Sequence, residues 1–231
     1  MFEIVILDEI RIVLALAMLG IACASDIKKR EIHDIIWVVF GAIAAGLIPF
    51  SGNLEKELYT VGISLIVAPI VIIIWRIGLF GGADAFALIV LAALAPGASL
   101  AGGTVSPFTV LTNAVLLSII PMLVNISRNF LLLAAKKDIF AGFDETRSRK
   151  IFAMIIGYRS ANPKFGFSIE RKVGEQKKLN LSLQHAENAA FCDKTDTWIT
   201  PGIPYLIFIA AGFVLQLVYG DIMFSIFSVF I

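Results

Sequence analysis

Residues 12–24 read IVLALAMLGIACA, an apolar run without a charged side chain, and Ser25-Asp26 follows it directly. Three basic residues, Lys28, Lys29 and Arg30, come just after it. An α-helix needs about 20 apolar residues to cross the hydrocarbon core of a bilayer. The stretch therefore predicts a membrane-spanning helix that ends close to Asp26, with positive charge just beyond its end.

The composition of the whole chain agrees with a membrane location. Of the 231 residues, 58% are hydrophobic and 16% are charged, whereas soluble domains carry about 45–50% apolar and about 25% charged residues. The net charge is +1, so no strong positive field favours nucleic acid, and none is expected as a partner. Cys23 and Cys192 lie far apart and form no CxxC pair, so we expect neither a metal site nor a disulfide framework.

Six apolar segments are candidates for membrane spans. We expect an all-α polytopic membrane protein in a lipid bilayer, with about six transmembrane helices and a small cytoplasmic, membrane-proximal domain with β content. The early acidic residues Glu3, Asp8 and Glu9 do not fit the positive start of a secretory signal, so we expect the first segment to be retained. The expected spans cover approximately residues 4–25, 34–51, 58–78, 84–103, 107–134 and 200–225.

Lysines and arginines set the expected orientation, because cytoplasmic loops carry an excess of them. When the six segments alternate across the membrane, all 19 basic residues except Arg11 and Lys56 fall on one side. We expect that side to be cytoplasmic. Both termini are then expected outside.

One long polar insertion interrupts the apolar pattern. Residues 165–171 and 179–183 alternate apolar and polar side chains, which is typical of half-exposed strands, and residues 150–158 fit a buried strand or a short helix. We therefore expect a membrane domain with helices one to five over residues 1–135, a cytoplasmic soluble domain over 136–198, and a final transmembrane helix within 199–231.

Two aspartates lie at the edges of apolar runs, where a charge is costly. Asp26 ends the first segment and Asp84 opens the fourth, so alternation places both at the cytoplasmic boundary. Ionisable residues in such positions are functional-site candidates, and two close carboxylates tend to share one proton. Two alternatives stay open. Asp84 can be a helix N-cap that follows Gly81, Gly82 and Ala83, and Asp26 can be an interfacial residue balanced by the neighbouring basic side chains.

The motifs around these aspartates resemble those of the type IV prepilin and preflagellin peptidases, membrane aspartyl proteases of the GxGD class. Residues 25–30, Ser-Asp-Ile-Lys-Lys-Arg, are similar to the first motif of that family. Residues 81–84, Gly-Gly-Ala-Asp, are similar to its Gly-x-Gly-Asp motif, with Ala83 as a departure. The proline-rich stretch 200–205 resembles the entry to the last helix in archaeal members. The sequence has neither a methyltransferase loop nor CxxC pairs. In this respect it resembles the archaeal preflagellin peptidase branch.

The resemblance implies an endopeptidase that removes a short basic leader from flagellin or pilin precursors, with no cofactor and no methyltransferase activity. It implies that Asp26 and Asp84 are the catalytic pair. We expect Asp84, at a helix start, to take a proton from the attacking water and Asp26 to carry the shared proton. Glu31 and Asp34 are candidates for contact with the basic leader, with a helix cap as the alternative for Asp34.

Two other classes of function remain open at this point. A presenilin-like intramembrane protease shares the GxGD element, but its partner aspartate usually follows a Tyr, whereas residue 25 is Ser here. A proton-coupled transporter or an assembly scaffold would use Asp26 and Asp84 to carry a proton or to pair with Arg76. Loss of precursor processing in the Asn variants separates an enzyme from a transporter or scaffold.

Overall fold

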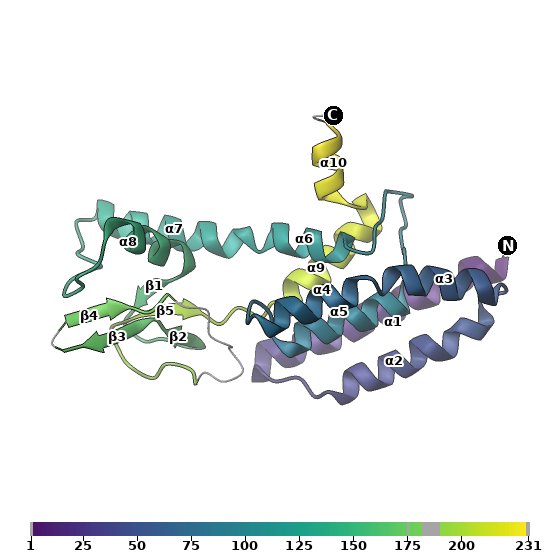
Figure 1. The fold of residues 1–231 in the computed structure, drawn as a ribbon, viewed down its shortest axis with the longest axis horizontal. Coiled ribbons are helices and arrows are strands. Elements are labelled where there is room, and N and C mark those ends of the chain that lie inside the picture. The colour runs from purple at the N-terminus through teal and green to yellow at the C-terminus, as the bar shows by residue number, and fades with distance from the viewer. Residues whose placement is uncertain (1, 175, 182–189, 230–231) are drawn as a thin grey trace. The chain divides into compact units, whose positions relative to one another are not determined.

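The computed structural model describes residues 2–174, 176–181 and 190–229, which form two compact units (Figure 1). The helical unit comprises Met1–Leu117 and Pro204–Ile231. The mixed unit comprises Ser118–Ile203 and contains both helices and strands.

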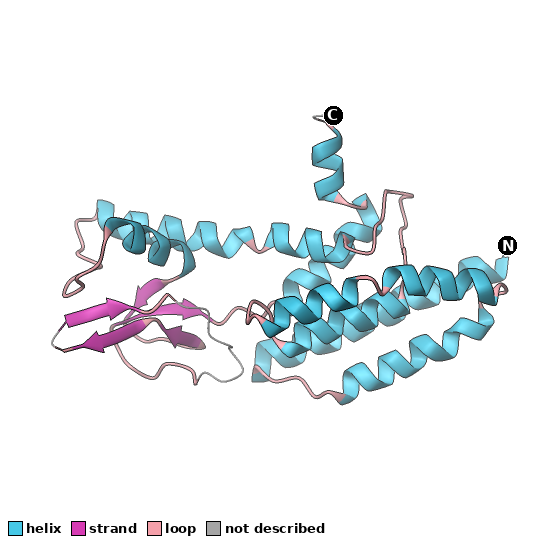
Figure 2. Ribbon diagram, viewed as in Figure 1, coloured by secondary structure: helices cyan, strands magenta, loops and turns pink. Residues whose placement is uncertain are grey.

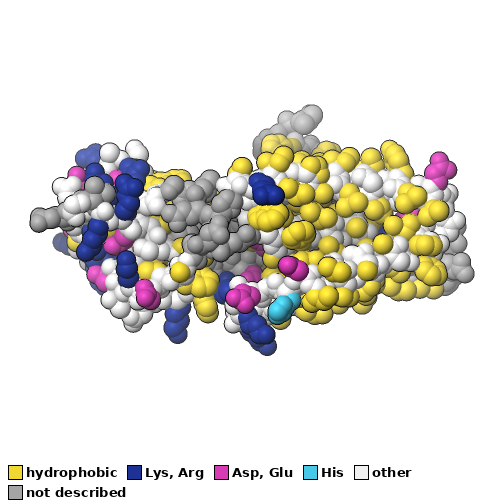
Figure 3. Space-filling model, turned by 60° about the horizontal axis from the view of Figure 1, so that its bottom comes forward, with side chains coloured by type: hydrophobic (Ala, Val, Ile, Leu, Met, Phe, Trp, Pro, Cys, Tyr) yellow, Lys and Arg dark blue, Asp and Glu magenta, His cyan; other side chains and the backbone are white. Residues whose placement is uncertain are grey.

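The described part of the helical unit is built from helices and loops. Many of its large apolar side chains are exposed, and in Figure 3 hydrophobic atoms cover most of the visible surface over these helices. Helices that are apolar on all faces are typical of membrane spans. The elements are α1 (Phe2–Lys29), α2 (Ile35–Leu47), the 3₁₀ helix η1 (Ile48–Phe50), α3 (Leu54–Ser64), α4 (Val67–Arg76), α5 (Gly82–Leu94), α6 (Thr109–Leu117), α9 (Leu206–Tyr219) and α10 (Ile222–Ser228).

Among the described residues, three helical stretches are long and apolar enough to cross a membrane. They are Ile6–Lys29, Leu54–Arg76 and Thr109–Ala134. The successive helices α9 and α10 are bent by 53° and would form a fourth span if they cross as one broken helix. The second and fourth expected spans correspond to shorter apolar helices, Ile35–Phe50 and Gly82–Leu94. The chain is thus mostly helical with several apolar spans, and a total of six transmembrane helices stays a prediction.

The expected fourth span over residues 84–103 is wrong in its extent. The helix ends at Leu94, because Pro96 disfavours helical geometry at the residue before it. Gly97 then adopts a φ of +68°, a conformation that glycine takes without steric cost. The Gly- and Pro-rich segment after Leu94 is therefore a loop.

The helix α5 lies at the centre of the helical unit. It packs against α1, α2, α3, α4 and α9. Small side chains allow neighbouring helix backbones to approach closely, and α5 is rich in alanine. More than half of its residues are buried, namely Gly82, Ala85, Ala87, Leu88, Val90, Leu91 and Leu94.

A buried ion pair joins α1 to α3. The Arg11 Nη1 atom lies 2.7 Å from the Glu57 Oε1 atom, and the two side chains are only 4% and 17% exposed. A charge buried among apolar helices is tolerated only when it has a partner. The pair therefore explains how the first span accommodates Arg11.

A buried asparagine holds the bend between α9 and α10. The Asn113 side chain of α6 donates hydrogen bonds to the carbonyl oxygens of Gly212 at 3.3 Å and Gly220 at 3.0 Å. Its Oδ1 atom accepts the Ile222 amide at 3.2 Å. Since no water reaches a buried helix break, a protein side chain must pair these backbone groups. Asn113 does so for the break at Gly220.

The mixed unit contains a small antiparallel sheet and a separate hairpin, drawn in magenta in Figure 2. The strand β5 pairs with β1 and with β2, which gives the order β1-β5-β2, and β3 pairs with β4. The elements are α7 (Ile119–Ala134), α8 (Arg147–Ile156), β1 (Tyr158–Ser160), β2 (Gly166–Ser168), β3 (Glu170–Val173), β4 (Gln176–Leu179) and β5 (Thr197–Pro201).

Trp198 forms the centre of the core of the mixed unit. It is fully buried, its indole N–H donates to the Ile139 carbonyl at 2.8 Å, and its ring stacks on Phe140 at 4.7 Å. The expected β content is confirmed. The alternation at 165–171 corresponds to β2 and β3, which flank Ile169.

Two other expectations for the polar insertion have different outcomes. Residues 150–158 form the end of α8 and the start of β1, so the short-helix alternative holds for most of them. Of the segment 179–183, Leu179 ends β4 and residues 182 and 183 lie outside the described residues. The domain boundaries expected at residues 135 and 199 stay a prediction, and in the structure both α7 and β5 belong to the mixed unit.

Replacing Asn113 by Leu should destabilise the helical unit by several kcal/mol. The change removes the partner of the Gly220 carbonyl and of the Ile222 amide at the helix break, and each such group costs about 1–3 kcal/mol. The Gly212 carbonyl lies within α9 and keeps a helical partner. Thermal unfolding of the purified protein in detergent measures the effect. Thr112→Val is the control, because it removes only one hydrogen bond within α6, to the Thr109 carbonyl. Equal melting temperatures for the two variants would contradict the role of Asn113.

The Arg159–Asp196 pair should make the mixed unit sensitive to acid. The guanidinium donates to both carboxylate oxygens at 2.7 Å and thereby holds the pKa of Asp196 below its ordinary value of 3.8. The pair stabilises the fold above that ordinary value, and this contribution is lost as the pH falls through the lower folded pKa. Carboxyl NMR titration measures it, and Arg159→Gln should return the pKa of Asp196 towards 3.8. An identical titration in both proteins would contradict the pairing.

Candidate active site

Asp26 lies in the last turn of α1, at the end of the apolar run. Its carbonyl oxygen accepts the Arg30 amide at 3.0 Å, and Arg30 has a φ of +57°, so the helix ends in a left-handed residue. The Ser25 hydroxyl donates to the Glu31 carbonyl at 2.9 Å. These two hydrogen bonds fix the backbone of residues 25–31 at the end of α1. The Asp26 side chain in this segment is half-buried.

Asp84 lies in the first turn of α5. The N-cap residue of this helix is Gly81, so the alternative that Asp84 is itself the N-cap is wrong. Instead, the Asp84 Oδ2 atom accepts the Gly81 amide at 3.1 Å, which is the bond that an acidic third residue makes in a capping box. The helix macrodipole also favours an anion here, by about 0.3–1 kcal/mol at exposed sites.

The structure brings the two aspartates to the same end of the helical unit. The helices α1 and α5 pack together in opposite directions, and the end of α1 lies beside the start of α5 (Figure 1). The Cys23 thiol, one helical turn before Asp26, interacts electrostatically with both carboxylates. Both acidic groups therefore lie at the same end of two packed helices.

Space is limited at position 81. Its φ of −74° is ordinary for any residue, but a Cβ there would lie 3.2 Å from the Asp84 Oδ2 atom. A side chain at this position would thus press on the carboxylate. Gly82 follows it as a buried residue in the first turn of α5.

The departure from the family motif at Ala83 has a simple structural reason. Ala83 lies within α5 and is half-buried against the core. A helical residue needs no positive φ, so the conformational freedom of glycine is not required there. An alanine at the third position of the motif is therefore compatible with the observed backbone.

Aromatic side chains from two elements meet next to the Gly81–Asp84 turn, a feature that the sequence analysis did not predict. The Phe80 ring lies 4.7 Å from the Tyr205 ring, which in turn lies 5.7 Å from Phe208. Tyr205 follows the proline-rich stretch that enters α9, and this stretch was the only sequence signal. The contact ties the start of α9 to the residue before the motif.

Glu31 and Asp34 lie in the loop that follows Asp26, and both are exposed. Asp34 occupies the N-cap position of α2, but its side chain makes no capping hydrogen bond. The positive charge of Arg30 acts on Asp26. The loop thus presents acidic and basic side chains together at the Asp26 end of the helical unit.

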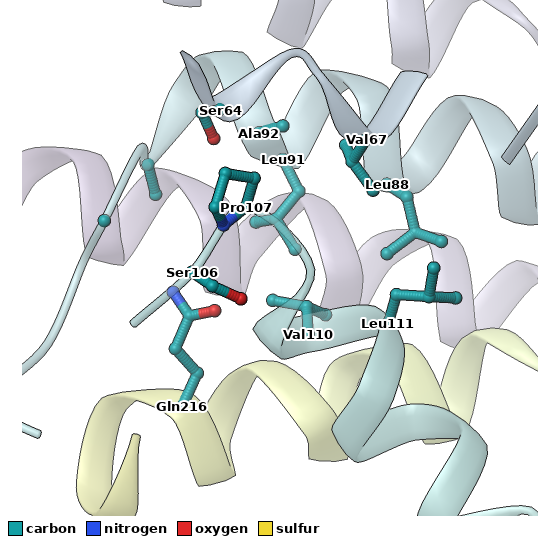
Figure 4. A pocket seen from close by; sticks show the side chains of 12 residues that line it. Ser64, Val67, Leu88, Leu91, Ala92, Ser106, Pro107, Val110, Leu111 and Gln216 are labelled. Atoms are coloured by element: carbon teal, nitrogen blue, oxygen red, sulfur yellow. The ribbon is translucent and has the colours of Figure 1, made fainter. Parts of the chain in front are cut away.

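A small cavity in the helical unit lies away from these residues. Figure 4 shows side chains from α5 and α6 that line it together with Ser106 and Gln216. Its volume is about 20 Å³, which is room for roughly one water molecule. It involves the second half of α5 from Leu88 onward, more than one turn beyond Asp84, so it is not the candidate active site. In the described part of the chain, no group of three or more His, Cys, Asp or Glu side chains has a metal-binding arrangement.

Comparisons with known proteins identify the family. Residues 13–124, which include both aspartates, match the type IV leader peptidase family, and residues 162–222 match the archaeal peptidase A24 C-terminus type II. The chain is 28% identical over 230 residues to the preflagellin peptidase of Methanocaldococcus jannaschii, covering 91% of this chain and 94% of the relative. It is 27% identical over 228 residues to the preflagellin peptidase of Methanococcus voltae, covering 92% and 97%.

These matches place the chain among the peptidases. Within that class it belongs to the type IV leader peptidase family. Together with the apolar helices, this makes it a membrane protein of a peptidase family.

Gly81→Ala should lower peptidase activity by about tenfold to a hundredfold. The added Cβ would lie 3.2 Å from the Asp84 Oδ2 atom and move the carboxylate slightly, and small displacements of a positioned group are costly, up to on the order of a hundredfold for about 1 Å. Ala83→Gly is the matched control, because the residue is helical and should lose no more than about 1 kcal/mol of stability. Cleavage of a precursor by equal amounts of each folded variant gives the comparison. Equal activity of Gly81→Ala and wild type would argue against Asp84 as a positioned group.

Proposed function

We propose that this protein is an aspartyl endopeptidase that removes the leader peptide of preflagellin or prepilin precursors at the cytoplasmic face of the cell membrane. The observation that carries the proposal is the meeting of the Asp26 end of α1 with the Asp84 end of α5. The two relatives are both named preflagellin peptidases, which supports the same class of substrate.

The chemistry divides between the two carboxylates. With one proton shared by the pair, the ionised member takes a proton from a water molecule, and the resulting hydroxide adds to the scissile carbonyl. The protonated member donates a hydrogen bond to the developing oxyanion. The C–N bond then breaks, the leaving amine takes up a proton, and the pair returns to its singly protonated state.

The surroundings support Asp84 as the base and Asp26 as the proton carrier. Asp84 accepts the Gly81 amide at 3.1 Å and lies at a helix start, and both features favour its anion. Asp26 lies in the last turn of α1, where the helix dipole favours the neutral form. The charge of Arg30 acts in the opposite direction on Asp26, so the assignment depends on the balance of these two effects.

The charge distribution supports a cytoplasmic active site and termini on the outer side. Lys28 and Lys29 lie in the last turn of α1, two and three residues after Asp26, and basic residues beside a span favour the cytoplasm. A precursor with a basic leader would meet the exposed carboxylates of Glu31 and Asp34 in the same loop. Opposite charges across an interface mainly increase the rate of encounter and fix the register. The hydrophobic helix after the cleavage site would remain in the bilayer.

A methyltransferase activity is not part of the proposal. The sequence resembles the archaeal branch that cleaves without methylating. The mass of the mature amino terminus tests this directly, because an added methyl group changes it.

Asp26→Asn and Asp84→Asn should each reduce processing by about a thousandfold or more, since removal of one member of a catalytic pair leaves only residual rate enhancement. The full chain is reconstituted in vesicles and incubated with a preflagellin precursor, and mass spectrometry identifies the new amino terminus. Asp193→Asn is the matched control, because it removes one exposed carboxylate of the mixed unit, away from the pair and from the loop after Asp26. An active Asp26→Asn protein would overturn the two-aspartate mechanism.

The same preparation tests the transporter alternative. A transporter would give no cleavage by the wild type, together with proton movement across the vesicle membrane that either Asn variant abolishes. Normal protein level and membrane insertion of both variants are the condition for either conclusion.

A further inference from the structure

Two asparagines of α7 lie one turn apart and fix the end of α8. Asn125 and Asn129 are 5% and 0% exposed, although the helix around them is strongly apolar. The Asn125 amide donates to the Ile155 carbonyl at 3.2 Å. The Asn129 amide donates to the carbonyls of Met154 at 3.0 Å and Gly157 at 2.7 Å. The last carbonyls of a helix have no partners within it, so these two side chains lock the end of α8 onto α7.

The hydrogen bonds of Asn125 and Asn129 fix the end of α8 beside the last turns of α7. The helix α7 ends the candidate span Thr109–Ala134, and Lys136 and Lys137 follow directly. Basic residues beside the end of a span indicate the membrane–water boundary. Asn129 lies within the last two turns of α7. The end of α8 that it holds is therefore close to the membrane–water boundary.

The free face of α8 is apolar. Ile151 is 61% exposed and Phe152 is 48% exposed, and the partly exposed Ile155 continues the same face at helical spacing. The opposite face is also apolar, because Ala153 is fully buried and Met154 packs against the core that contains Trp198. The core therefore covers only one side of α8 and leaves an isoleucine and a phenylalanine uncovered.

The polar residues of α8 are basic. The helix contains Arg147, Arg149 and Lys150 and no acidic residue. Arg149 is engaged by Glu145, with 2.6 Å between Nε and Oε2, whereas Arg147 is exposed. Lys136 and Lys137 follow the end of α7, on the same side of the span. Basic side chains beside an exposed apolar face are the pattern of a helix that lies in an anionic membrane surface.

We propose that α8 is an interfacial helix that holds the mixed unit against the anionic cytoplasmic leaflet. Ile151 and Phe152 lie at the boundary between headgroups and acyl chains, and the exposed Arg147 and Lys137 contact lipid phosphates. Lys150 is not part of this contact, because its Nζ atom lies over the Phe140 ring at 5.4 Å. The proposal concerns how the mixed unit meets the membrane and does not depend on the cleavage chemistry. A second copy of the chain is the competing occupant of this face, and the experiment distinguishes the two.

A nitroxide spin label at residue 152 tests the proposal in the full-length protein. The label is attached to Phe152→Cys in a Cys23→Ala, Cys192→Ala background, and the protein is reconstituted in vesicles with or without phosphatidylglycerol in phosphatidylcholine. Collision with dissolved oxygen reports the lipid phase, and collision with a nickel chelate reports water. Arg171→Cys, on the exposed strand β3, carries the control label. In anionic vesicles, we expect oxygen to exceed the chelate at residue 152 and the reverse at residue 171.

Charge removal tests the role of the basic residues. The Lys137→Gln, Arg147→Gln protein should shift the label at residue 152 towards water in anionic vesicles. The ratio of membrane-inserted to water-exposed label should fall by about fivefold for each charge lost. Removal of two exposed lysines elsewhere in the mixed unit, with Lys164→Gln and Lys194→Gln, is the matched control and should have no such effect.

Three results would overturn the proposal. A label at residue 152 that meets the chelate as freely as residue 171 would place α8 in water. A label shielded from both reagents would indicate that protein, such as a second copy, covers this face. Equal insertion of the label at residue 152 in vesicles with and without phosphatidylglycerol would contradict the proposed contact with anionic lipid. Processing of a precursor by the same samples is scored separately, so failure of the proposed peptidase function is distinguishable from failure of this one.

Discussion

An apolar environment provides no partner for a polar group, and this constraint accounts for where the polar side chains of the helical unit lie. Arg11 is buried beside Glu57, and Asn113 is buried where the backbone between α9 and α10 breaks. Each satisfies a group that would otherwise be unpaired. Asp26 and Asp84 differ from them because each lies at a helix end, half-buried, at one end of the unit. Each carboxylate is therefore partly exposed at a helix end and partly covered by apolar helices.

The geometry of that end depends on α5. Its alanines allow five other helices to pack around it, and its first turn carries Asp84 to the end of α1. The Gly81 amide then fixes one oxygen of the carboxylate. The proposed site is built on helix termini, whose orientation follows from packing, so its two carboxylates need no long loop to position them. Membership of the type IV leader peptidase family agrees with a site formed by these two motifs.

The mixed unit applies the same constraint in another way. Asn125 and Asn129 would be costly on an apolar helix, but they pair the free carbonyls at the end of α8. The polar groups of one helix and the unpaired end of another thus satisfy each other. No described residue of this unit covers Ile151 and Phe152 on the other face of α8. The lipid surface proposed above would cover them.

The apolar runs, the basic residues that follow them and the acidic residues at their edges were sufficient to predict a helical membrane protein, its β-containing insertion and the aspartates of interest, because these features depend on local composition. The resemblance of residues 25–30 and 81–84 to family motifs was also visible in the sequence alone. Only the tertiary structure decided that Phe80 meets Tyr205 and that the buried Asn113 side chain pairs backbone groups at the break between α9 and α10. These features depend on contacts between residues far apart in the chain, and hydrophobic periodicity carries no information about which helices will be neighbours.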